Sequence, residues 1–157
     1  MLHARYVLDD CRYALELLDD EHDPRRFRVL WVAAVALMRA VGHTLKYRDA
    51  KENEGTAKAV AQAWKRWKDD RASNSIFWDF IDQERYMVIK EGRHRYDEGD
   101  MGLTFADPIS GGLKVEILSE DIYKPMCYGT FETCDCRELV REAIEWWDRE
   151  LAAIERS

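Results

Sequence analysis

The sequence predicts a mainly α, up-and-down bundle of about five helices, with a small β-hairpin inserted before the last helix. Three observations predict this fold. Apolar residues recur at helical spacing over most of the chain, start and stop signals separate the helical segments, and the pattern changes to short alternating runs over residues 101–132. The 157 residues contain no internal repeat or linker, which favours a single domain over residues 1–157 with the hairpin inside it.

The first predicted helix runs from about His3 to Asp20. Asp23 and Pro24 then mark a second start, because an acceptor side chain followed by proline suits the first helical turn. This second helix runs to about Arg48. Its middle, Val29–Met38, is apolar all round, which predicts the central helix of the bundle. A run of ten residues is too short to cross a bilayer, so we expect no membrane partner.

A third helix is expected over Ala57–Arg71, with Thr56 as its cap and Trp64 and Trp67 turned inward. The best-formed amphipathic segment follows, and it predicts a fourth helix over Ser73–Gly92. Its apolar stripe is expected to lie in the core and contains Phe77, Phe80, Ile81 and Val88, with Glu84 inside it.

Two short strands are expected at Leu103–Ala106 and Leu113–Leu118, joined by a glycine-containing turn. Tyr128–Glu132 is a candidate third strand. The last helix is expected to start near Asp135, where Asp135 and Glu138 have the spacing of a capping box.

Composition bounds the function. The net charge is −7 and 35% of residues are charged, which argues against bulk attraction to nucleic acid or anionic membrane. The N-terminus lacks the apolar run of a signal peptide, so a cytoplasmic protein is expected. Cys127, Cys134 and Cys136 would offer three thiolates to zinc, but no fourth ligand is evident. Ordinary reduced thiols are favoured, and neither a metal nor a cofactor is predicted.

The sequence has none of the common nucleotide-binding, serine-hydrolase or zinc-protease motifs. Arg39 and His43, one turn apart at the end of the buried run, are candidate binding residues. A buried arginine needs a carboxylate, and Asp82 or Glu84 would supply it, which makes both candidate binding residues too. The alternative is an internal ion pair that only fixes helix register. Asp82 and Arg85, three residues apart, would also form a half-buried pair.

The segment Arg85-Tyr86-x-x-x-Lys90 resembles a substituted form of the R-N-x-x-x-H motif of HEPN domains. Those domains are all-helical, many are metal-independent ribonucleases of toxin and defence systems, and many act as dimers. The resemblance implies catalytic positions at Arg85 and Lys90, and a homodimer. Lysine replaces an imidazole poorly in acid–base catalysis unless its pKa is strongly depressed. His94, one turn beyond Lys90, is a candidate substitute, and His43 is another.

Three functions therefore remain open, and the sequence does not decide whether the protein is an enzyme. The first is a non-catalytic, dimerising or interaction module of HEPN-like type, with RNA or a protein as partner. The second is a ribonuclease that uses Arg85, Lys90 and His94. The third is a small-molecule binder. An Arg39–His43 pair that lines a cavity would favour the third function, whereas burial of Arg39 against Glu84 would indicate a structural role.

Overall fold

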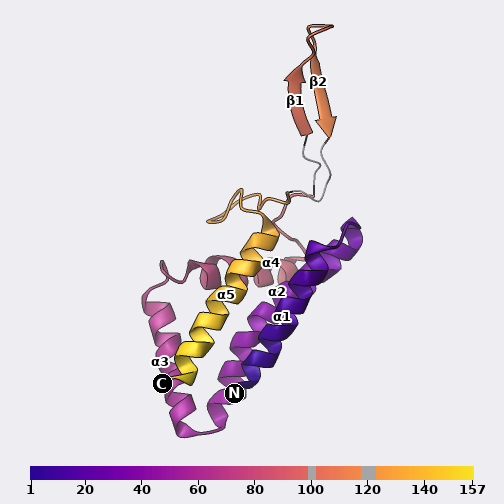
Figure 1. Ribbon diagram of the computed structural model, residues 1–157. Coiled ribbons are helices and arrows are strands. Elements are labelled where there is room, and N and C mark those ends of the chain that lie inside the picture. The colour runs from indigo at the N-terminus through magenta and orange to yellow at the C-terminus, as the bar shows by residue number, and fades with distance from the viewer. Residues whose placement is uncertain (99–101, 118–122) are drawn as a thin grey trace.

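The computed structural model describes residues 1–98, 102–117 and 123–157, and it confirms a mainly α bundle with a hairpin before the last helix. Figure 1 shows α1, α2 and α5 alongside one another, α3 beyond α5, and both termini at one end of the bundle. The described helices are α1 (His3–Asp19), α2 (Pro24–Tyr47), the 3₁₀ turn η1 (Asp49–Lys51), α3 (Glu54–Asp69), the π-helix η2 (Ile76–Asp82), α4 (Gln83–Glu91) and α5 (Cys136–Glu155).

Helix α2 is the central helix, and Asp23 caps it as expected by accepting the backbone N–H of Arg26 at 2.8 Å. The expectation that its middle is buried all round is wrong. Val29 and Val32 are 65% and 40% exposed, because α2 packs on α1, α4 and α5 but leaves one face uncovered. The segment Pro24–Lys51 is long and apolar enough, by length and composition, to cross a membrane. Eight residues of α2 nevertheless lie in the core of the bundle.

The fourth predicted helix is two helices in the structure. Residues Ile76–Asp82 form the π-helix η2, and α4 continues from Gln83 to Glu91, where Gly92 ends it in the left-handed conformation. The predicted core residues of this segment are confirmed as buried: Phe77, Phe80, Ile81 and Val88. Such π-turns are rare and add a residue to the turn, which changes the direction in which later side chains leave the helix.

One predicted helix cap, Thr56, is wrong, and the capping box predicted at Asp135 is confirmed only in its first residue. Helix α3 begins three residues earlier than expected, with Asn53 accepting the backbone N–H of Thr56 at 2.8 Å. Asp135 caps α5, but Glu138 does not complete a capping box, because its carboxylate accepts a hydrogen bond from Arg141 at 2.6 Å. The acceptor side chains were recognisable in the sequence, but the position that reaches a free N–H depends on the path of the preceding loop.

The hairpin has the predicted strands, β1 (Gly102–Ala106) and β2 (Leu113–Ile117), paired antiparallel. Figure 1 shows it standing away from the helices. Residues 101 and 118–122, which belong to the predicted insertion 101–132, lie outside the described residues. Tyr128–Glu132 is a series of bends and turns, so the candidate third strand is wrong. Instead, two isolated antiparallel bridges fix the segment between the hairpin and α5: Met126 pairs with Tyr96, and Pro125 pairs with Asp135.

Candidate ligand-binding site

A cavity of about 450 Å³ lies between α2, α3 and η2. Its volume is in the range of pockets that bind small molecules. Helix α2 contributes Arg39, His43 and Lys46, α3 contributes Val60, Trp64 and Lys68, and η2 contributes Trp78 and Asp82. Residues that are one and two turns apart on α2 thus line the cavity together with side chains from helices far along the chain.

Arg39 forms part of the cavity wall. Its Nε donates to Oδ1 of Asp82 at 3.0 Å, and its side chain is 19% exposed. The guanidinium carbon lies 5.5 Å from the centre of the Phe77 ring and 6.0 Å from that of Trp64, within the range of a cation–π contact. The predicted partnership of Arg39 with Asp82 is confirmed. Asp82 therefore pairs with α2, and not with Arg85 on α4.

Two residues that line the cavity each have a hydrogen-bond donor that lies behind the cavity surface and lacks an acceptor. Nη1 of Arg39 and Nε1 of Trp64 are both buried, and neither has a partner in the structure. Among the described residues only four buried side-chain nitrogen or oxygen atoms are unpartnered. Burying a donor without an acceptor costs about 1–3 kcal/mol, so a pair of them beside one cavity needs a physical reason.

His43 lies in a positive electrostatic environment. Partial burial lowers the pKa of its imidazole, and the positive charges of Arg39, Arg85 and Lys46 lower it further, while Asp82 opposes them. The ring stands edge-on to Tyr47, with the ring centres 5.9 Å apart. His43 is therefore a neutral imidazole near pH 7, available as an acceptor or a proton carrier.

Arg85 lies beside this cavity. A smaller hollow of about 230 Å³ is lined by Arg39, His43 and Arg85 together with Ile89. The structure thus brings one of the predicted catalytic residues, Arg85, to the predicted binding residues on α2. The two hollows share Arg39 and His43, so they form one continuous basic region.

The other predicted catalytic residues line neither hollow. Lys90 is exposed near the end of α4. His94 stacks on Tyr96 with ring centres 3.9 Å apart, and its Nε2 lies 3.1 Å from Glu98. His94 lines a separate hollow of about 300 Å³ with Trp31. Arg85 therefore shares a site with His43, and Lys90 and His94 do not take part in it.

Glu84, the fourth predicted binding residue, is fully buried away from this cavity's lining. Its carboxylate accepts the Trp31 indole N–H at 3.1 Å, the backbone N–H of Arg95 at 3.1 Å and Nε of Arg95 at 2.6 Å. The two arginines that flank His94 in the sequence point in different directions: Arg93 pairs with Glu91 at the surface, and Arg95 points into the core. Glu84 thus holds the loop after α4 against α2.

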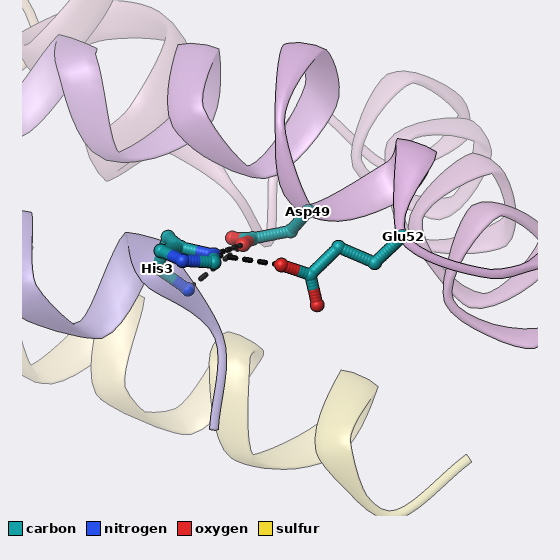
Figure 2. A group of neighbouring side chains, drawn as sticks. All are labelled: His3, Asp49 and Glu52. Atoms are coloured by element: carbon teal, nitrogen blue, oxygen red, sulfur yellow. Dashed lines mark hydrogen bonds and ion pairs between the residues drawn. The ribbon is translucent and has the colours of Figure 1, made fainter.

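Figure 2 shows a group that sequence reasoning missed, made of His3, Asp49 and Glu52. Nδ1 of His3 lies 3.0 Å from Asp49 and 2.9 Å from Glu52. The donor atoms are of types that bind divalent metals. The buried Asp49 carboxylate, however, already accepts the backbone N–H groups of His3 and Ala4, at 2.8 and 3.0 Å. We therefore assign the group to capping the first turn of α1.

All four cysteines carry free thiols. Burial raises the pKa of Cys11 to about 12 and that of Cys136 above any physiological pH, so both are unreactive in the core. Cys127 and Cys134 are exposed. In the part of the chain that the structure describes, Cys127, Cys134 and Cys136 do not form a group compact enough to share a metal ion.

Comparisons of the sequence with protein families and with curated proteins, and of the fold with solved structures, find no match.

Proposed function

We propose that this protein is a cytoplasmic small-molecule-binding helical bundle whose ligand occupies the cavity between α2, α3 and η2. The observation that carries the proposal is that Arg39 and His43 both line this cavity. A purely structural arginine would be enclosed with its carboxylate and have all its donors satisfied. Arg39 instead pairs with Asp82 at the cavity wall and retains an unpartnered Nη1.

The test blocks the cavity and measures binding. A fragment library is screened against ¹⁵N-labelled protein by NMR, and the fragments found are titrated into Ala61→Phe and Gln62→Phe. Both positions are exposed on α3, but only Ala61 lines the cavity. We expect Ala61→Phe to weaken binding at least about tenfold and Gln62→Phe to leave it unchanged. Equal binding by both variants would contradict the proposal, as would a library that yields no ligand shifting cavity residues.

A second candidate is the HEPN-like dimerising module, and an exposed apolar face supports it. Val29, Val32 and Ile89 are 65%, 40% and 52% exposed, and they line hollows along the seam between α2 and α4. Such a face suits a second copy of this chain. Light scattering on the intact protein is expected to give a dimer that Val32→Glu dissociates. Ile109→Glu, at an exposed residue of the hairpin, is the control. A monomer at all concentrations removes this candidate.

Ribonuclease activity is a third candidate, because Arg85 and the neutral His43 line one hollow. An arginine beside an imidazole of suitable pKa is able to stabilise phosphate charge and accept the proton of a ribose hydroxyl. The activity would be metal-independent, with RNA as substrate. RNA cleavage in the presence of chelator, lost in both Arg85→Ala and His43→Ala, is the expected result. Folded protein that leaves single- and double-stranded RNA intact removes the candidate.

A further inference from the structure

We propose that the ligand of this cavity is a small aromatic carboxylate, an inference that rests on the proposed binding function and specifies its chemistry. The carboxylate is held by the cationic side chains of α2 and α3, and the ring lies between tryptophans. Three observations carry the inference: the charges that line the cavity, the kind of hydrogen-bonding atom it leaves unpaired, and its aromatic walls.

The charges lining the cavity are mainly positive, although the whole chain has a net charge of −7. Arg39, Lys46 and Lys68 contribute three cations, and Asp82 is the one carboxylate among the lining residues. Asp82 is already engaged by Arg39. Arg85 lines the adjoining hollow. This local excess of positive charge attracts an anionic ligand and disfavours a cationic one.

The unpaired atoms in the cavity wall are donors. Nη1 of Arg39 and Nε1 of Trp64 each carry N–H and have no capacity to accept a hydrogen bond. Both atoms are covered by neighbouring atoms, so a ligand that satisfies them must displace those atoms and bring acceptors. The two oxygens of a carboxylate suit two donors, and the bond to a guanidinium would be charge-assisted. A carboxamide of the same shape offers one oxygen and no charge.

The remaining walls are flat and apolar. Trp64, Trp78 and Tyr47 line the cavity with Val60, and the Trp78 indole is fixed because its Nε1 donates to the backbone carbonyl of Trp67 at 2.8 Å. Aromatic walls favour a planar ring, which stacks on a face or meets an edge. A simple inorganic anion would leave these walls in contact with water, so we expect the ring and the carboxylate to be required together.

Protonation of His43 is expected to accompany binding. The charged groups that face His43 are Arg39 and Lys46 from its own helix and Arg85 and Asp82 from α4 and η2. A bound carboxylate adds a negative charge to this set and raises the pKa of the imidazole. Affinity should therefore increase as the pH falls from 8 towards the lowered pKa of His43 in the free protein.

The test uses naphthalene-2-carboxylate, naphthalene-2-carboxamide and 2-naphthylmethylamine, titrated calorimetrically into the intact protein at pH 7. We expect the carboxylate to bind at least about tenfold more tightly than the amide or the amine. Lys46→Gln and Lys68→Gln should each weaken carboxylate binding about threefold to tenfold. Lys58→Gln, at an exposed α3 residue outside the lining, should have no effect. Inorganic phosphate and phenyl phosphate complete the series.

Each remaining outcome counts against the inference in a distinct way. If the carboxamide binds as tightly as the carboxylate and Ala61→Phe abolishes both, the cavity binds small molecules but the anionic ligand class is wrong. Preference for the amine or for phenyl phosphate also overturns the carboxylate assignment and leaves the binding function intact. If none of the naphthalene probes or library fragments shifts a cavity residue, both the ligand class and the proposed function fail.

Discussion

Arg39 shows what could be predicted about single residues from the sequence. Its position one turn from His43, at the end of an apolar run, predicted a polar face beside the core, and the two residues do line one cavity. The sequence offered Asp82 and Glu84 as alternative partners. The choice of Asp82 depends on the direction in which η2 presents its side chains, which no local pattern specified.

The positive environment of His43 has a measurable consequence. Burial and the charges of Arg39 and Arg85 lower its pKa below 6.5, so the unfolded chain binds a proton at a higher pH than the folded protein does. The free energy of unfolding should therefore fall as the pH drops below about 6.5, and His43→Gln should reduce that fall. An NMR titration should give a His43 midpoint below 6.5 that rises in Arg85→Gln. A midpoint unaffected by Arg85→Gln would contradict this.

Glu84 is expected to matter for stability and not for binding. In Glu84→Gln the buried guanidinium of Arg95 loses its counter-charge, which should lower the free energy of unfolding by about 3–5 kcal/mol. Urea unfolding monitored by circular dichroism measures the change. Glu145→Gln, at an exposed position on α5, should stay within about 0.5 kcal/mol of the wild type. Equal stability of the two variants would refute the assigned role of Glu84.

Among the elements, η2 shows that periodicity predicts which residues are buried but not which kind of helix they form. The spacing of Phe77, Phe80 and Ile81 correctly predicted burial, because apolar residues at intervals of one, three and four remain on one side in either kind of helix. The same spacing did not predict the π-turn. The π-turn occurs where Phe77 packs against Trp64 and Trp146, which come from distant segments of the chain. A local sequence pattern does not reveal such contacts.

The start of α5 provides a test of how this element is capped. Asp135 accepts the backbone N–H of Arg137 at 2.9 Å and of Lys124 at 2.8 Å, so its carboxylate joins the helix to the returning loop. Burial alone would raise the pKa of Asp135, but these hydrogen bonds and Arg137 outweigh it and lower the pKa. We expect Asp135→Ala to lower the free energy of unfolding by about 1–3 kcal/mol.

Glu138→Ala is the matched control, since the exposed Glu138 side chain pairs with Arg141 one turn along α5. Its effect in thermal unfolding should be below about 0.5 kcal/mol. If Glu138→Ala lowers the free energy of unfolding as much as Asp135→Ala does, Glu138 takes part in capping α5, and the assignment of the cap to Asp135 alone is wrong. The pKa of Asp135 is lowered in the folded protein. Its contribution to stability should therefore be lost only as the pH falls below the pKa of an ordinary aspartate.

On the scale of the whole molecule, the bundle was predictable and the site was predictable only in part. Amphipathic periodicity fixes which residues of α5 face inward, and Leu139, Trp147 and Leu151, which share one face at helical spacing, are all buried. A cavity is a property of how three helices diverge, so the joint lining by Lys46, Lys68 and Trp78 could not be read from their positions in the chain.

The hairpin should be separable from the bundle. The side chains that the structure describes in it, those of residues 104–114, contribute nothing to the hydrophobic core, and Asp107 is buried within the hairpin's own turn. Replacing residues 102–117 with a short glycine–serine linker should therefore leave the midpoint of thermal unfolding within about 3 °C of the wild type. The helical circular dichroism signal should be unchanged. A loss of more than about 10 °C would mean that the hairpin stabilises the helices.

The central claim, that a ligand occupies the cavity, is tested most directly by the indole N–H signals of the six tryptophans in an NMR titration. Trp64 and Trp78 line the cavity, whereas the indoles of Trp31 and Trp146 donate to Glu84 and Asn74 in the core. On addition of naphthalene-2-carboxylate, the Trp64 signal should move downfield as it gains an acceptor, and Trp78 should shift with it. Trp31 and Trp146 should not move. A Trp64 signal that stays in place while the others shift would contradict the account.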